Sequence, residues 1–156
     1  CGGELAAQGR WDNGLSARLT YAYTNEQLAK DKDGNTINNQ YIPARKHAVN
    51  VRLDYDHDFT KNYGISAGIS GRVLSGTENV EYKNYYDVSE GTVSVKYPAY
   101  TIWKLSLVQR IGKAITLTTA LDNLLNYRPK HYYLNCPLTD GTTLQVGLRV
   151  DIDKLF

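Results

Sequence analysis

The sequence has no methionine, not even at position 1, and only two cysteines, Cys1 and Cys136. The missing initiator residue predicts that the chain is a processed product or a piece of a longer protein. Nothing in the setting of either cysteine requires them to pair, so a disulfide between them stays an open question.

Long apolar runs and an excess of charge of one sign are also absent. No run approaches the roughly 18 apolar residues that a membrane helix needs. A net charge of +2 with 22% charged residues gives no basic footprint for nucleic acid. The mean hydropathy of −0.46 resembles that of a water-soluble protein. That average is uninformative for membrane strands, because they alternate apolar and polar residues.

Catalytic and metal-binding motifs are missing as well. No nucleophile–base spacing, carboxylate pair, Cys-x-x-Cys motif or phosphate loop occurs, so the sequence predicts no enzyme and no cofactor. The segment from Asp31 to Asn35 faintly resembles a calcium loop, but it lacks the third ligand and the distal glutamate. We interpret it as a solvated turn. His47, His57 and His131 are scattered, which favours surface histidines over haem or metal ligands.

The sequence does contain an alternation of aliphatic and polar residues with a period of two, which is typical of strands. It is clearest in the last segment, where Leu144, Val146 and Leu148 begin an apolar face that the parity of Phe156 continues. Seven strands are predicted: 4–11, 15–26, 46–58, 63–75, 100–111, 114–125 and 142–156. No helical period occurs. The fold prediction is an all-β, antiparallel up-and-down meander of about seven strands.

The predicted connections alternate in length. Short turns include Asp12-Asn13-Gly14 and Gly112-Lys113, whereas the polar stretches 27–45, 76–99 and 126–141 are predicted as long loops. Short turns at one end of a sheet and long loops at the other are typical of outer-membrane barrels.

Charged and aromatic residues follow the same pattern. The strand arginines all take the parity opposite to the aliphatic residues: Arg10, Arg18, Arg52, Arg72, Arg110 and Arg149. An arginine facing lipid at mid-bilayer costs roughly 2–4 kcal/mol, although a soluble core would exclude arginine too. Aromatic residues fall near both predicted sheet ends: Trp11, Tyr55 and Tyr63 near the short turns, and Tyr21, Tyr23 and Trp103 near the loops. This placement indicates two aromatic girdles, with aromatics capping a β-sandwich as the alternative.

The strand count points to a larger assembly. A meander of seven strands leaves two unpaired edges, which proteins normally close or protect. Bacterial single-chain barrels have even numbers of strands. We therefore expect further strands outside this chain.

Four segments carry a family resemblance. Residues 121–127, Leu-Asp-Asn-Leu-Leu-Asn-Tyr, resemble the Asp-Asn-Leu-Phe-Asn-x-x-Tyr segment near the C-terminus of TonB-dependent outer-membrane receptors, with Leu125 where Phe is commoner. Residues 97–107 resemble the loop-to-strand entry two strands before that family's end. Residues 147–156 resemble the closing strand of such receptors from Bacteroides-like bacteria, and residues 41–50 resemble the re-entry into an earlier strand.

The resemblance implies a function and a location. Such receptors are 22-stranded transmembrane β-barrels with a plugged lumen in the outer membrane of Gram-negative bacteria. They bind a bulky, scarce nutrient (an iron chelate, haem, cobalamin or a glycan), and the TonB complex drives its uptake. Residues 1–156 would form the C-terminal segment of the barrel, in contact with outer-membrane lipid. The plug and the earlier strands would precede it.

Two sets of candidate site residues follow from this interpretation. Inward charged residues that would line the lumen are Arg52, Asp54, Asp56, Arg72, Arg110, Asp122 and Arg149. They could border a substrate path, but pairing with each other and with the plug, which satisfies their charge in a confined lumen, is the favoured interpretation. Tyrosines in the longest loop are candidates for ligand capture, because tyrosine offers a large contact area at low entropic cost. They are Tyr82, Tyr85, Tyr86 and Tyr97, and self-packing of the loop is an equal alternative.

Two other functions stay open at this point. One is a small structural or adhesive outer-membrane barrel. The other is a soluble secreted β-sandwich or lipocalin-like binding protein. In the soluble alternative Leu19, Val51, Leu105 and Val150 would meet in a common dry interior. In a receptor wall these side chains would face outward.

Overall fold

The structure, a computed structural model, describes residues 1–26, 32–33, 45–84, 86–129 and 141–154. These residues form nine strands and two short 3₁₀ turns: β1 (Gly2–Arg10), β2 (Leu15–Thr24), β3 (His47–Thr60), β4 (Tyr63–Leu74), β5 (Thr77–Tyr82), η1 (Val88–Glu90), β6 (Thr92–Tyr97), β7 (Tyr100–Ile111), β8 (Ile115–Asp122), β9 (Thr143–Val150) and η2 (Ile152–Lys154). Among the described residues, no helix has the length and apolar character needed to cross a membrane.

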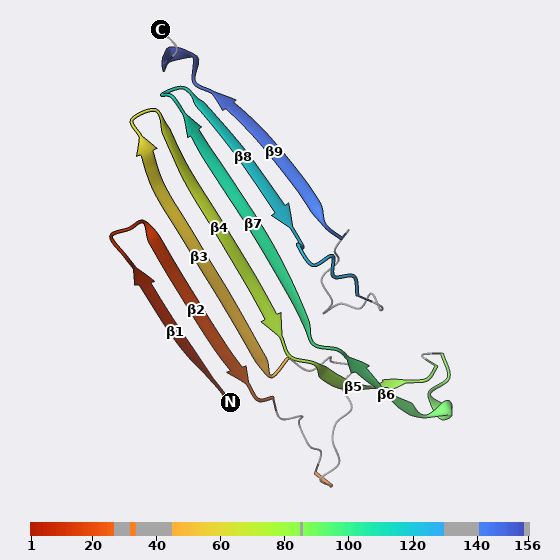
Figure 1. The fold of residues 1–156 in the computed structure, drawn as a ribbon. Coiled ribbons are helices and arrows are strands. Elements are labelled where there is room, and N and C mark those ends of the chain that lie inside the picture. The colour runs from red at the N-terminus through yellow and green to blue at the C-terminus, as the bar shows by residue number, and fades with distance from the viewer. Residues whose placement is uncertain (27–31, 34–44, 85, 130–140, 155–156) are drawn as a thin grey trace.

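Seven of the strands form one antiparallel sheet in the order β1-β2-β3-β4-β7-β8-β9. Figure 1 shows them side by side, with the short turns at one end and the strand ends that the long connections join at the other. Each strand therefore pairs with its neighbour in sequence once the β5–β6 hairpin is set aside. The predicted all-β, seven-stranded antiparallel meander is confirmed.

The register gives the sheet one apolar and one polar face. Residues directly opposite each other on antiparallel strands point to the same side. One row of opposed residues crosses all seven strands: Gly9, Ala17, Leu53, Ile69, Leu105, Leu121 and Leu144. The adjacent row on the other face contains Arg18, Arg52, Ser70 and Lys104. The apolar positions predicted for the separate strands therefore all lie on the same face of the sheet.

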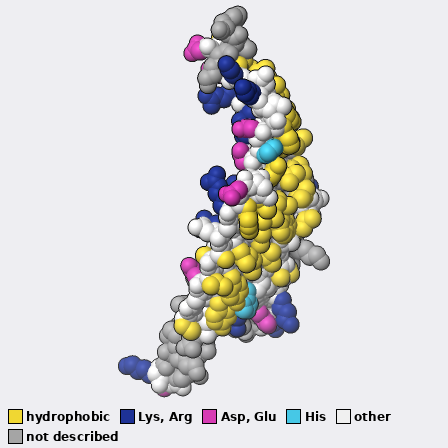
Figure 2. Space-filling view, turned by 60° about the vertical axis from the view of Figure 1, so that its left-hand side comes forward, with side chains coloured by type: hydrophobic (Ala, Val, Ile, Leu, Met, Phe, Trp, Pro, Cys, Tyr) yellow, Lys and Arg dark blue, Asp and Glu magenta, His cyan; other side chains and the backbone are white. Residues whose placement is uncertain are grey.

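The apolar face is uncovered in the part of the chain that the structure describes. Leu19, Leu105 and Val150 are 46%, 43% and 44% exposed, so they do not meet in a dry interior. Figure 2 shows hydrophobic side chains along the convex side of the sheet and charged side chains along the concave side. A sandwich that buries its aliphatic face between two layers does not fit this arrangement.

A glycine on the apolar face makes room for a tryptophan. Gly71 lies directly opposite Trp103, and a Cβ added to Gly71 would lie 2.5 Å from Cε3 of the indole ring. The ring therefore lies over the glycine, as aromatic residues do when they cover a weak point in a sheet.

The turn between β1 and β2 follows its predicted Asp-Asn-Gly chemistry. Gly14 has a φ of 88°, which favours glycine, and its N–H donates to the carbonyl of Trp11 at 3.1 Å. Its own carbonyl accepts from the N–H of Asp56 at 3.0 Å. The turn is therefore held against β3 as well as closed on itself.

The segment 76–99, predicted as a loop, instead contains the β5–β6 hairpin. Thr77 pairs with Tyr97 and Tyr82 with Thr92 in a two-stranded sheet of its own. Figure 1 shows it extending away from the end of the large sheet. The prediction missed it because each strand has only six residues, and although Val93, Val95 and Tyr97 of β6 do alternate with polar residues, β5 is mostly polar.

The closing strand is shorter than predicted. β9 ends at Val150 rather than at Phe156, and residues 152–154 form η2. The cause lies in its neighbour, because β8 begins at Ile115, which pairs with Val150. Beyond that pair the N–H of Asp151 donates to the carbonyl of Ala114 at 2.8 Å. Phe156 lies outside the described residues.

Candidate ligand-facing surface

All seven charged residues predicted to line a lumen lie in strands of the large sheet and on its polar face. Arg52, Asp54 and Asp56 lie on β3, Arg72 on β4, Arg110 on β7, Asp122 on β8 and Arg149 on β9. The register places most of them opposite polar residues or glycines of the neighbouring strands, whereas Arg72 has Ile102 opposite it on β7. Their role in lining a lumen stays a prediction.

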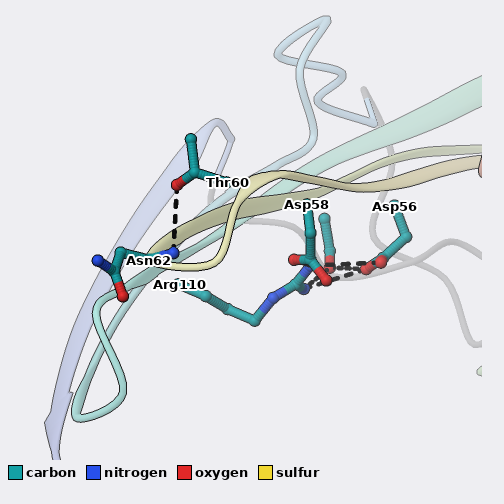
Figure 3. A network of polar contacts seen from close by, with 6 residues as sticks. Asp56, Asp58, Thr60, Asn62 and Arg110 are labelled. Carbon is teal, nitrogen blue, oxygen red and sulfur yellow. Dashed lines mark hydrogen bonds and ion pairs between the residues drawn. The ribbon is translucent and has the colours of Figure 1, made fainter.

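Near the short turns, one arginine joins two carboxylates. Nη2 of Arg110 lies 2.8 Å from Oδ1 of Asp58, and Nη1 lies 3.1 Å from Oδ2 of Asp56. The hydroxyl of Ser66 accepts from Arg110 at 2.6 Å and donates to Asp56. Figure 3 shows this network beside the Thr60–Asn62 turn. It connects β3, β4 and β7, so it cross-links three strands through their polar face.

Two further ion pairs lie on the same face, closer than the Arg110 network to the end of the sheet with the long connections. Arg52 forms a bidentate pair with Asp54, with N–O distances of 2.7 and 2.8 Å. Nζ of Lys104 lies 2.8 Å from Oδ1 of Asp122. These side chains are partly exposed, so each pair contributes at most about 1 kcal/mol. Their main effect is to neutralise charge locally.

A depression opens on the polar face between these pairs. It has a volume of about 490 Å³ and is lined from five strands, β2, β3, β4, β7 and β8. Four cationic side chains contribute to it: Arg18, Arg52, Arg72 and Lys104. We refer to this depression as the basic pocket. Sequence parity placed these residues on one face, but only the register showed that they converge.

The predicted loop tyrosines are spread along the β5–β6 hairpin. Tyr97 is 3% exposed at the root of the hairpin, whereas Tyr86 is fully exposed beyond the end of β5. Tyr82 is half-buried at the far end of β5, and Tyr85 lies outside the described residues. With about 3.3 Å per residue, Tyr82 and Tyr97 lie at opposite ends of a hairpin roughly 17 Å long. A ligand at the hairpin tip would meet Tyr82 and Tyr86 before Tyr97.

Short-range polar contacts hold the hairpin tip. Nδ2 of Asn84 donates to Oε1 of Glu90 at 3.0 Å. Both the hydroxyl and the backbone N–H of Ser89 donate to Asp87, which lowers the pKa of that carboxyl below its usual value. The carboxyl is therefore charged at neutral pH and gives the tip a fixed anionic group.

At the root of the hairpin the structure adds a cluster that the sequence did not predict. Nη1 of Arg45 donates to the carbonyls of Ser75 and Pro98, at 2.5 and 2.8 Å. Its guanidinium lies 4.6 Å from the centroid of the Tyr100 ring, which stacks on Tyr127 at 5.1 Å. In the sequence, Tyr100 falls on the polar face of its strand together with Lys104 and Arg110. This position was the one signal that could have indicated a polar partner for its ring. The cluster fixes the hairpin to the sheet.

The 121–127 segment is a turn built around a buried asparagine. Asn123 is 4% exposed, has a φ of 50°, and exchanges two 2.8 Å hydrogen bonds with the backbone of Tyr127. The carbonyl of Asn123 also accepts from the hydroxyl of Thr142 at 2.9 Å. This left-handed residue ends β8 at Asp122 instead of the predicted Leu125. The motif therefore has a structural role at the loop end of the sheet.

The described histidines lie on the apolar face among aromatic residues. Nδ1 of His47 lies 2.8 Å from the hydroxyl of Tyr21, and the His57 ring stacks on Tyr55 at 5.9 Å. His131 and Cys136 lie outside the described residues, and Cys1 is exposed and free. Among the residues that the structure describes, no group of three or more His, Cys, Asp or Glu is arranged to hold a metal ion.

Comparison with known proteins is consistent with this architecture. A family model described as "TonB dependent receptor-like, beta-barrel" matches residues 2–124, which is most of the chain. The match ends just after β8, so β9 lies beyond it. No curated protein matched the sequence. An uncovered apolar face, a charged polar face and long connections at one end are features of outer-membrane barrels. The chain belongs to the TonB-dependent receptor-like β-barrel family, the outer-membrane receptors and transporters of Gram-negative bacteria.

Proposed function

We propose that residues 1–156 form the C-terminal wall of a 22-stranded receptor that takes up a bulky, scarce nutrient: an iron chelate, haem, cobalamin or a glycan. The plug and the remaining strands belong to other parts of the protein. One observation carries the proposal, namely the single curved sheet whose apolar face is exposed and whose charged face is concave. The wall needs neighbours, because β1 and β9 each pair on one side only in the described sheet.

In this proposal the nutrient is captured first at the end of the sheet with the long connections. Outer-membrane barrels direct such connections outward. The β5–β6 hairpin extends from that end and carries Tyr82 and Tyr86 near its tip. Binding and TonB-driven transport, with no catalytic step, account for the absence of a catalytic arrangement in the sequence.

An uptake assay tests the proposal. The full-length receptor is expressed in a Gram-negative host that depends on it, and uptake of each nutrient class is measured with and without a functional TonB complex. We expect uptake of one class, with complete dependence on TonB. Uptake that continues without TonB would overturn the transport mechanism.

A paired variant tests the tyrosines in the same assay. Tyr82→Ser combined with Tyr86→Ser should weaken apparent affinity by about 10-fold or more, since each lost aromatic contact costs on the order of 1 kcal/mol. Tyr63→Ser is the matched control, because Tyr63 lies at the opposite end of the sheet and its hydroxyl donates to Gln109. Unchanged affinity in the double variant would remove the tyrosines from the binding site.

A further inference from the structure

The basic pocket carries more positive charge than its neighbouring carboxylates neutralise. Of its four cations, Arg52 pairs with Asp54 and Lys104 pairs with Asp122. The side chains of Arg18 and Arg72 form no hydrogen bond or ion pair with the part of the chain that the structure describes. Two guanidinium groups therefore remain uncompensated at the pocket.

The strand register brings the arginine side chains close together, so their repulsion destabilises the sheet when no anion is bound. Arg18 on β2 lies directly opposite Arg52 on β3, and like charges in directly opposed positions are destabilising. Arg72 lies on the next strand, opposite Asn50 and so diagonal to Arg52. Three arginines from three adjacent strands thus lie side by side on one face. An anion held between them would turn the mutual repulsion into attraction.

The lining of the pocket restricts the chemistry of such an anion. A guanidinium fork matches the paired oxygens of a carboxylate or a phosphate. Ile102 lies opposite Arg72 and provides an apolar wall, while Nδ2 of Asn50 donates to Oγ1 of Thr20 at 3.0 Å on the other side. The volume of about 490 Å³ is within the usual range for small-molecule sites.

The pocket also lies on the path that the proposed function requires. Arg72 is near the end of β4, and Lys104 is near the start of β7, so both lie toward the end with the long connections. A molecule captured at that end would meet the basic pocket before the Arg110 network near the short turns.

We propose that the basic pocket binds an anionic group, a carboxylate or a phosphate, of the transported nutrient through Arg18 and Arg72, beside the Arg52–Asp54 pair. This inference rests on the proposed function, because it assigns the pocket to the nutrient that the receptor takes up. It narrows the nutrient to molecules that carry such a group.

Direct binding to the purified full-length receptor tests the proposal. Succinate and inorganic phosphate are titrated separately by calorimetry, with ionic strength held constant by sodium chloride. We expect saturable binding of at least one of them, and the preferred probe distinguishes a carboxylate from a phosphate. Absence of saturable binding of both would overturn the proposal, including the case in which another part of the receptor fills the pocket.

Variants then locate the binding. Arg18→Gln combined with Arg72→Gln should weaken binding at least 10-fold. Arg10→Gln should leave it unchanged, because Arg10 is an exposed arginine on the same face but lies opposite Ser16, outside the pocket. Equal losses in both variants, or no loss in the double variant, would contradict the assignment.

Folding and uptake are scored separately. The heat-dependent gel mobility of each purified variant shows whether it is folded, and Arg72→Lys, which keeps the charge, provides a second variant with an expected intermediate affinity. Anion binding without TonB-dependent uptake would count against the proposed function alone. Uptake without anion binding would count against the pocket alone.

Discussion

Asn123 shows how one side chain determines where a strand ends. Its φ of 50° is uncommon for residues other than glycine, but asparagine tolerates it. The buried amide replaces the strand pairing that β8 loses by bonding both the N–H and the carbonyl of Tyr127. The loop after β8 therefore starts from a defined backbone geometry.

Replacing this amide should destabilise the receptor. Asn123→Ala removes two part-buried hydrogen bonds to the backbone of Tyr127 and places alanine in a left-handed conformation. We expect a loss of about 2–4 kcal/mol in the free energy of unfolding. Urea-induced unfolding of the full-length receptor in lipid vesicles measures it. Leu125→Ala, an exposed change in the same turn, should cost much less. Similar losses for both variants would refute the role of the amide.

Each strand of the large sheet has one face whose side chains suit contact with lipid and one face whose side chains do not. β7 shows this well, because Leu105 at its centre is 43% exposed and its neighbour Lys104 pairs with Asp122 on the other face. The strand is stable only if its apolar face contacts lipid and its polar face contacts water or other polar groups.

An arginine on the apolar face of β7 tests this requirement. Leu105→Arg should lower the stability of the full-length receptor in vesicles by roughly 2–4 kcal/mol, because Leu105 lies mid-strand on the face assigned to lipid. Thr118→Arg places the same side chain at an exposed position on the polar face of β8 and should cost little. Folding yields and urea midpoints measure both. A larger loss for Thr118→Arg than for Leu105→Arg would reverse the assignment of the faces.

The elements that sequence could predict were those with a strict alternation. The strand predicted at 46–58 agrees with β3 to within two residues, because Val49, Val51 and Leu53 alternate cleanly with charged and polar residues. The β5–β6 hairpin was missed, since both strands are only six residues long and β5 is mostly polar, although β6 does alternate. The end of β9 was misplaced because it depends on where β8 begins, which is a tertiary fact.

The candidate site was predictable only in part, for a similar reason. Parity placed Arg52 and Arg72 on the polar face. Only the register between strands could show that Arg18 lies directly opposite Arg52 and that a pocket forms between them. Likewise, Arg45 could not be connected to Tyr100 without knowing how the hairpin leaves the sheet.

The whole molecule is a curved wall with two different surfaces. Its convex side is apolar, its concave side carries the ion pairs and the basic pocket, and the strand ends from which the long connections leave lie at one end. Family membership assigns this wall to an outer-membrane barrel. Each proposed role, from ligand capture at the hairpin to anion binding in the pocket, depends on the apolar side facing lipid.

The most direct test of this dependence is the accessibility of two adjacent residues of β4 in the full-length, cysteine-free receptor in lipid vesicles. Ile69 lies between Leu53 and Leu105 on the apolar face, and Ser70 lies between Arg52 and Lys104 on the polar face. Nitroxide labels are attached at Ile69→Cys and Ser70→Cys and probed by electron paramagnetic resonance. The account predicts that the label at 69 is relaxed by oxygen and shielded from a water-soluble nickel complex, with the opposite preference at 70. A label at 69 that is shielded from oxygen, or that is relaxed mainly by the nickel complex, would contradict it.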